Sequence, residues 1–323
     1  MSYAVTASLP PEAASFSATA TGARALRRQF PGLTGCVAAL GALGVVCLAG
    51  LALDPREITG VPAWLKPLKF CVSGALYAGT LAVLMRPLAG RRLARVVDWG
   101  VGGILVFETV LIAAQAARGV TSHFNVSTPL DAAIFASMGV AIATLSVLTL
   151  VAAVALVRAP QASGAMKRAA VWGLALSLAG GSVGGLMTQP TPDQIAAFES
   201  GPPQTVGAHT VGVADGGAGL PVTGWSTEGG DLRVPHFWGL HALQALPLLA
   251  LALGRLPLGA RQRGWLVHVG GLVYGGVLGV LLWQALRGQP LLAPDSATLG
   301  ALGAVLGAGA LATLAIVRWT RAE

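Results

Sequence analysis

The chain has 323 residues, of which 54% are hydrophobic and 11% are charged, and its mean hydropathy is +0.70. Values this apolar lie outside the range of soluble globular proteins and indicate an integral membrane protein, whose partner is the lipid bilayer. The formal net charge of +8 could suggest nucleic-acid binding, but the basic residues lie between the apolar segments and form no patch. The pattern argues against a nucleic-acid partner.

Apolar segments long enough to cross a bilayer occur eight times along the chain, and none has the alternating polarity of a barrel strand. The sequence therefore predicts an all-α fold, a polytopic transmembrane bundle of about eight spans. Prolines near most of the boundaries agree with helix ends at those points. The expected spans cover residues 33–53, 69–87, 98–118, 131–157, 169–189, 236–254, 264–286 and 297–317.

Basic residues set the expected orientation, because short loops rich in Lys and Arg stay in the cytoplasm during insertion. With residues 1–32 as a cytoplasmic tail, 15 of the 21 Lys and Arg side chains lie on the cytoplasmic side. Residues 33–317 then form the membrane domain, and residues 318–323 form a second cytoplasmic tail. The sequence predicts a multi-pass protein of a bacterial inner membrane with both termini inside.

The third expected span carries a polar stripe. An ionisable group at mid-helix costs about 2.5–3.5 kcal/mol on insertion scales, so it needs compensation from a partner or from water. Glu108 and Gln115 are seven residues apart and share one helix face, and Arg118 lies one turn further along. The stripe continues outward to His123 and Asn125. We expect Glu108 to face the interior of the bundle, either protonated or paired.

The fourth and sixth expected spans also begin with polar groups on the outer side. Asp131 opens the fourth span, and the sixth, "VPHFWGLHALQALPLL", carries His236, His241 and Gln244. His236 and His241 are about 140° apart around an ideal helix, which is poor geometry for binding one metal ion from a single helix. Each histidine is therefore expected to pair with a residue of another span.

These groups converge if the third and sixth helices lie side by side, which predicts an outward-facing polar pocket. The long loop 190–235, rich in Gly, Pro and Asp, is expected to cover the pocket or to be disordered. The alternative is a hydrogen-bond network that only holds helices together. The predicted catalytic groups are Glu108, Arg118 and His241, the predicted substrate ligands are Gln115, Asn125, Asp131 and Gln244, and the predicted metal ligands are His123, His236 and His241.

Other polar residues are given structural interpretations. Lys66 and Lys69 are interpreted as contacts to lipid headgroups, and His209, in the long loop, as a solvated side chain. The cytoplasmic end offers only Asp98 and His268 as polar candidates for a transport path.

Three functional hypotheses follow. The favoured one is a membrane-embedded enzyme or redox protein that binds a metal ion or haem and a small-molecule or lipid ligand, because buried ionisable groups in membranes are usually functional. The second is a solute or proton-coupled transporter in which Glu108 titrates. The third is a sensor or assembly subunit whose polar network serves only packing.

Overall fold

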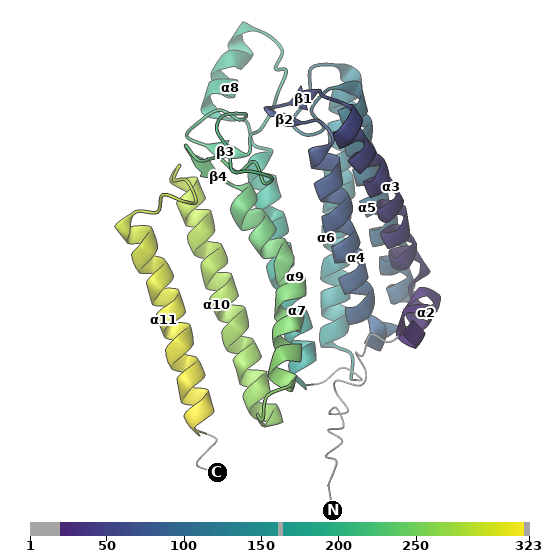
Figure 1. The fold of residues 1–323 in the computed structure, drawn as a ribbon, viewed down its shortest axis with the longest axis vertical. Helices are drawn as coiled ribbons and strands as arrows, with labels where there is room; N and C mark the ends of the chain where they lie inside the picture. Colours follow the sequence, from purple (N-terminus) through teal and green to yellow (C-terminus); the bar gives the residue numbers. More distant parts are fainter. Residues whose placement is uncertain (1–19, 161–163, 320–323) are drawn as a thin grey trace, which may run out of the picture.

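A computed structural model describes residues 20–160 and 164–319 of the chain. Within these ranges eight helices are long and apolar enough to span a membrane, which confirms the expected helical multi-pass architecture. The first of them begins and the last ends at the same end of the bundle (Figure 1). They are α3 (Pro31–Leu53), α4 (Leu65–Leu84), α5 (Arg92–Arg118), α6 (Pro129–Val157), α7 (Gly164–Met187), α9 (Arg233–Gly254), α10 (Ala260–Leu286) and α11 (Ser296–Trp319).

Shorter elements lie between the long helices. Two antiparallel strand pairs belong to connections at one end of the bundle, where β1 pairs with β2 and β3 pairs with β4. We call this end, formed by residues 54–64, 119–128, 188–232 and 287–295, the loop end. The shorter elements are α2 (Ala20–Gln29), β1 (Glu57–Ile58), β2 (Val61–Pro62), η1 (Arg86–Leu88), α8 (Pro192–Ala197), η2 (Phe198–Ser200), β3 (Thr210–Val211) and β4 (Gly230–Asp231).

Several helices begin earlier than their apolar windows. Helices α4, α5 and α7 start at Leu65, Arg92 and Gly164, four to six residues before the expected spans. Hydropathy detects only the part of a helix that lies in hydrocarbon, so polar turns at the membrane surface are missed.

The expected tails are described only in part. Residues 1–19 and 320–323 lie outside the described residues. Helix α2 occupies the end of the first expected tail, where Leu26 packs against the core and Arg27 and Arg28 are exposed.

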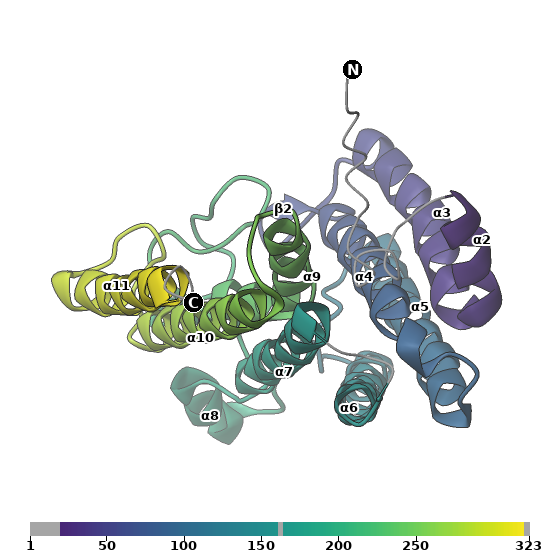
Figure 2. The same cartoon turned by 90° about the horizontal axis from the view of Figure 1, so that it is seen from below.

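The long helices form two groups. Helices α3 to α6 pack mainly against one another, as do α7, α9, α10 and α11. The two groups meet where α6 packs on α7 and where α4 contacts α9 more sparsely, a boundary that we call the seam (Figure 2). Helices α5 and α9, the third and sixth spans, share at most marginal contact, because α4 lies between them. The expectation that these two helices lie side by side is wrong.

A buried carboxylate of α5 caps the beginning of α3. Asp98 accepts hydrogen bonds from the backbone N–H groups of Gly32 (3.0 Å) and Leu33 (2.8 Å). The first N–H groups of a helix have no partner within it, so a carboxylate at this position stabilises the helix as an N-cap does. A Cβ at Gly32 would lie 2.7 Å from the Asp98 carbonyl oxygen, which makes glycine necessary at this crossing.

Helices α7 and α9 make the most extensive helix contact in the described chain. They cross at Gly180 and Gly239, where a Cβ on Gly180 would lie 2.5 Å from the Gly239 Cα. Small residues allow transmembrane helices to approach closely, so that dispersion contacts and short polar contacts can form. This crossing fixes the position of the first turns of α9.

We expect Gly180→Ala to lower the thermal stability of the purified protein, by about 1–3 kcal/mol, because the added methyl group forces the two backbones apart. Gly181→Ala is a matched control on the next residue, since a Cβ there meets no atom within 4 Å. Thermal unfolding in lipid nanodiscs measures the difference. Equal stability of the two variants would show that the crossing is not as close as described.

Candidate functional site

The loop between α5 and α6 turns back into the bundle. Gly119 ends α5 in the left-handed conformation (φ 77°), and Phe124 adopts φ 65°. A non-glycine residue at positive φ is strained, and the strain persists only where the surroundings fix it. Here the Phe124 ring is buried in a small apolar cluster with Val183 and Leu232, and its carbonyl accepts a hydrogen bond from the Val206 N–H (2.9 Å). Phe124 therefore fixes the position of the neighbouring His123, whose side chain is partly buried (23% exposed).

His123 lies next to the buried carboxyl of Glu108. The distance from His123 Nε2 to Glu108 Oε1 is 3.8 Å, which is too long for a direct hydrogen bond. The imidazole lies near Phe70 of α4 (5.9 Å between ring centroids) and Phe135 of α6 (6.4 Å). Glu108 is 2% exposed, and its Oε2 has no hydrogen-bond partner in the described part of the chain. Such an unsatisfied buried oxygen is rare in native proteins and leaves the pair open to a further donor.

The loop environment keeps His123 neutral. Burial lowers the pKa of His123 well below its ordinary value of 6.5, and the charges of Lys66, His209 and His236 lower it further. The Ser122 hydroxyl lies 2.9 Å from His123 Nδ1 and orients the ring. A neutral imidazole can accept a proton, so His123 and Glu108 form a pair suited to proton exchange.

His236 joins the site from the first turn of α9. Its Nδ1 lies 2.8 Å from the Gly180 carbonyl oxygen in α7. A carbonyl oxygen only accepts, so Nδ1 donates the hydrogen and Nε2 of the neutral ring remains an acceptor. The close approach of α7 and α9 at Gly180 thus also sets the orientation of this histidine.

His209, expected to be solvated, belongs to the same site. Its Nδ1 donates to Asp215 Oδ2 (2.6 Å), and its ring packs against Phe124 with 4.8 Å between centroids. Burial lowers the pKa of His209, while the hydrogen bond to Asp215 acts in the opposite direction. Burial also opposes ionisation of Asp215, but hydrogen bonds and the charge of His209 hold its pKa below the ordinary range. The glycine-rich loop has no periodicity, so no local signal could have shown that His209 is partly buried.

Two lysines of α4 that are expected to contact lipid headgroups also interact within the protein. Lys66 lies one helical turn before Phe70, and its charge acts on both His123 and His209. Lys69 donates to the carbonyl oxygen of Val222 (3.2 Å), in the long connection between α7 and α9. Both lysines therefore interact with the loop-end residues.

Three of the predicted site residues form a self-contained clamp between α5 and α6. Gln115 Nε2 donates to Asp131 Oδ1 (2.9 Å), and Arg118 donates to the same oxygen (2.7 Å) and to Gln115 Oε1. Thr128, the N-cap of α6, donates its hydroxyl to Asp131 Oδ2 (2.6 Å). Asn125 is used locally, since its Oδ1 accepts from the Ser127 N–H (3.1 Å). These bonds use the oxygen atoms of Asp131, so the clamp supports the packing interpretation for this group.

The structure does not bring His241 and Gln244 to the loop-end residues. His241 is exposed on α9, because five residues of helix turn it away from His236. Gln244 faces α4 across the seam, where its Nε2 lies 3.3 Å from Thr80 Oγ1 and its buried Oε1 has no partner in the described chain. Among the described residues, no three His, Cys, Asp or Glu side chains are placed to hold a metal ion.

The polar candidates at the opposite end have structural partners. Asp98 caps α3, as described above, and His268 Nδ1 accepts a hydrogen bond from Trp172 Nε1 (2.9 Å). The cysteines Cys36, Cys47 and Cys71 are buried and free, as small core residues would be.

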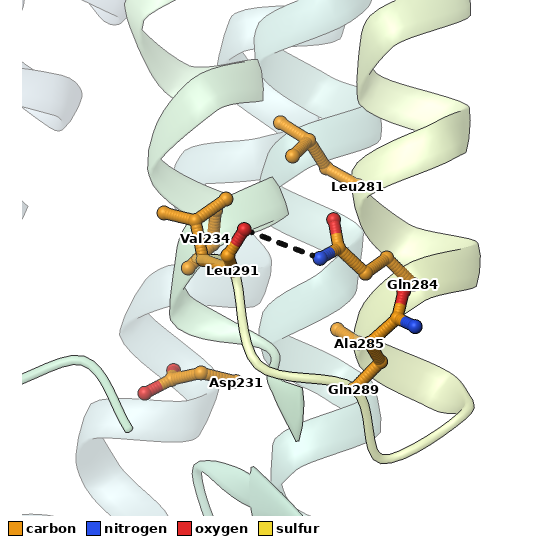
Figure 3. A pocket seen from close by; sticks show the side chains of 7 residues that line it. All are labelled: Asp231, Val234, Leu281, Gln284, Ala285, Gln289 and Leu291. Atoms are coloured by element: carbon orange, nitrogen blue, oxygen red, sulfur yellow. Dashed lines mark hydrogen bonds between the residues drawn. The ribbon is translucent and has the colours of Figure 1, made fainter. Parts of the chain in front are cut away.

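A small cavity lies beside the beginning of α9 and the end of α10 (Figure 3). Its volume of about 10 Å³ is room for about one water molecule. The polar groups around it are bonded to the protein: Asp231 accepts from Arg233 (2.6 Å), and Gln284 Nε2 donates to the Leu291 carbonyl oxygen (3.3 Å). This cavity is therefore a structural feature and not a ligand pocket.

Comparison with known proteins gives no match. No family model fits the chain, and no curated protein or solved structure is significantly similar to it. The residues of the site therefore carry the functional inference.

Acidification should destabilise the loop end. The pKa values of His123 and His209 lie below 6.5 in the folded protein, so the unfolded chain binds protons more readily than the folded one. The resulting stability is complete above about pH 6.5 and decreases as the pH falls below that value. Thermal unfolding measured from about pH 7.5 to about pH 5 should show this decrease. The loss of stability on acidification should be smaller in His123→Gln and the same as in the wild type in His241→Gln. If His123→Gln lost as much stability as the wild type over this pH range, the lowered pKa assigned to His123 would be wrong.

Asp131→Ala should lower stability by roughly 1–3 kcal/mol, because Gln115 and Arg118 would lose the acceptor that they share. Glu57→Gln, at an exposed carboxyl of the same end, is the control and should have little effect. Denaturant titration in detergent micelles measures both. Wild-type stability of Asp131→Ala would show that the clamp does not hold α5 to α6.

Proposed function

We propose that the protein is a membrane-embedded enzyme that performs acid–base chemistry at the loop end, with Glu108 as the group that exchanges a proton with the substrate. The observation that carries this proposal is the Glu108 carboxyl, which is 2% exposed. One of its oxygens has no partner among the residues that the structure describes, and the other lies 3.8 Å from His123 Nε2. Ionisable groups at membrane depth typically mark substrate sites and proton relays. An unpartnered oxygen is costly unless a ligand uses it.

His123 is the acid–base partner of Glu108. It is neutral near pH 7 and held by a strained loop, so it can receive the proton of Glu108 or return one without a large movement. His236 offers a second acceptor nitrogen from the other helix group. Arg118, Gln115 and Asp131 act as positioning residues, because their clamp fixes the start of the loop that carries His123.

The substrate class follows from the location of the site. The loop end joins the apolar helices to the polar connections, which suits a small molecule or a lipid headgroup that approaches at the membrane surface. The distribution of Lys and Arg favours the outer face of a bacterial inner membrane for this end, since 15 of the 21 basic residues lie on segments expected at the other end.

A metal ion or haem has weaker support. Of the three predicted metal ligands, His241 lies on the exposed face of α9. A haem needs only one or two axial histidines, and His236, with its Nε2 available, keeps that role as a prediction. The absorbance spectrum of the purified protein, compared with that of His236→Ala, tests whether His236 is an axial ligand of a haem.

A proton-coupled transporter is the second candidate, favoured by the seam. The buried Gln244 Oε1, which has no partner in the described part of the chain, lies in this boundary next to Thr80, as a polar group on a solute path would. At the opposite end, the two polar candidates that the sequence offers for a continuation, Asp98 and His268, are bonded to α3 and Trp172. The enzyme proposal needs access from one end only and therefore agrees better with the geometry.

Glu108→Gln should abolish activity while leaving the fold intact, because glutamine keeps the shape of the side chain but cannot exchange the proton. Wild-type protein in nanodiscs would be incubated with membrane lipids and with a cell metabolite extract, and products would be followed by mass spectrometry. A mass change made by the wild type and by Glu57→Gln should be absent with Glu108→Gln. If Glu108→Gln kept its turnover, the enzyme proposal would be wrong. Solute uptake into vesicles that requires Glu108 would favour the transporter.

A further inference from the structure

We propose that Lys66, Lys69 and the turn at Thr223 form an anion site, which holds a phosphate group of the substrate beside Glu108. The phosphate belongs either to a lipid headgroup or to a free phosphorylated molecule, and both sources present the same oxyanion. This inference rests on the proposed function, because it assigns a substrate class to that site.

Three cations gather where α4 and α9 begin, at the loop end of the bundle (Figure 1). Lys66 and Lys69 lie in the first two turns of α4, and Arg233 is the first residue of α9. They are close enough to repel one another electrostatically. The beginning of a helix carries a partial positive charge and favours acidic side chains, but the first turns of both helices contain none. An anion at this point would be stabilised by the three charges and by the two helix ends.

One turn of the long connection is bonded to both helices. Lys69 Nζ donates to the carbonyl oxygens of Val222 and Thr223, at 3.2 Å each. Arg233 donates to the carbonyl oxygen of Gly224 (2.6 Å). Val222 has a φ of 66°, which is strained for a β-branched residue and persists because these bonds fix the turn. Residues 222–224 therefore hold the lysines of α4 and the start of α9 in one cluster.

Two hydrogen-bond donors of this cluster have no partner in the described part of the chain. Thr223 Oγ1 is buried without a hydrogen bond. The Lys66 ammonium makes no hydrogen bond or ion pair with a described residue, whereas Arg233 pairs with Asp231 (2.6 Å). Unsatisfied buried groups are rare in native proteins, and a phosphate oxygen accepts from ammonium and hydroxyl groups alike. An oxyanion is therefore the class of ligand that suits both donors.

The nearby carboxyls do not replace such a ligand. Asp215 and Glu108 attract Lys66 electrostatically, but neither forms an ion pair with it in the described part of the chain. Asp215 is bonded to His209 instead (2.6 Å). The charge of Lys66 acts on both Glu108 and His123. A phosphate bound by Lys66 would therefore lie beside the group that exchanges a proton.

The cluster is open to the surface of the molecule. Both lysines of α4 are partly exposed, and the Val222 side chain beside them is 70% exposed. Cationic groups next to an exposed apolar side chain suit the boundary between lipid headgroups and hydrocarbon. A phosphate can thus reach the lysines along the membrane surface.

Nonspecific attraction of anions to exposed lysines is the competing explanation. Such attraction depends only on charge, so it does not require the Thr223 hydroxyl. Thr223→Val removes this hydroxyl but keeps the shape of the side chain and the charge of the protein. The variant therefore separates a built site from a general effect of charge.

The test measures binding to the full chain by native mass spectrometry in a maltoside detergent, which contains no phosphate. The probes are phosphatidylglycerol and glycerophosphate. Lys66→Gln should weaken binding by roughly tenfold or more, because its hydrogen bond to phosphate is charge-assisted, and Thr223→Val should weaken it by about two- to tenfold. Lys167→Gln, at the third lysine of the chain and the opposite end of the bundle, should bind as the wild type does.

A second measurement needs no variant that might misfold. Succinimidyl acetate acylates lysine side chains, and mass spectrometry of peptides reports the rate at each lysine of the wild-type protein. A bound probe should slow acylation of Lys66 severalfold and leave that of Lys167 unchanged.

The outcomes decide the existence of the site and the source of the phosphate. Binding of phosphatidylglycerol alone assigns the phosphate to a lipid headgroup, whereas binding of glycerophosphate assigns it to a free molecule. Wild-type affinity in Lys66→Gln, or acylation of Lys66 that neither probe slows, overturns the site. Wild-type affinity in Thr223→Val, or an equal loss in Lys167→Gln, would show attraction by charge alone and would also overturn it.

Glu108→Gln distinguishes the anion site from the proposed activity. Glutamine cannot exchange the proton but leaves the donors of the anion site in place, so this variant should bind the probe and lose turnover. If turnover requires Glu108 but no probe binds, the anion site is overturned and the proposed function stands. If a probe binds but turnover does not require Glu108, the site stands as a binding site and the proposed function is overturned.

Discussion

In hydrocarbon there is no water to satisfy a polar group, so each one needs a partner within the protein. This constraint explains most of the polar residues in the bundle. Asp98 caps the first N–H groups of α3, and Asp131 accepts from Gln115, Arg118 and the N-cap of α6. Glu108 departs from the pattern, because one of its buried oxygens has no hydrogen-bond partner among the described residues, as is also true of Gln244 Oε1 at the seam. At the candidate site, the described residues alone do not satisfy the Glu108 carboxyl.

Close helix packing determines where that site can form. The glycine crossing of α7 and α9 holds His236 against the Gly180 carbonyl oxygen, and the turned-back loop after α5 holds His123 against Glu108. One group of helices supplies the carboxyl and the other supplies a histidine, so the site lies at the loop end of the seam. The strained backbone at Phe124 is consistent with a loop whose position is set by function as well as by packing.

The residues assigned to the site differ in how much of their role could be predicted. The cost of an ionisable group in a membrane singles out Glu108 from the sequence alone, and helix periodicity places Gln115 and Arg118 on its face. His209 gives no such signal, because it lies in a glycine-rich loop without periodicity. His241 is a residue type suited to the predicted site, but its side chain points away from it. The rotation of α9 about its axis depends on packing partners that are distant in sequence, so the sequence could not show this.

The sequence by itself determined that the chain is a multi-pass helical membrane protein with eight apolar spans, because span length and hydropathy are local properties set by the thickness of the bilayer. Only the tertiary structure decided which helices are neighbours and which side chains meet. Those outcomes depend on the fit of small residues such as Gly180 and Gly239 between helices, and on loops that fold back onto the bundle. Interactions of that kind join residues far apart in the chain, and no local pattern records them.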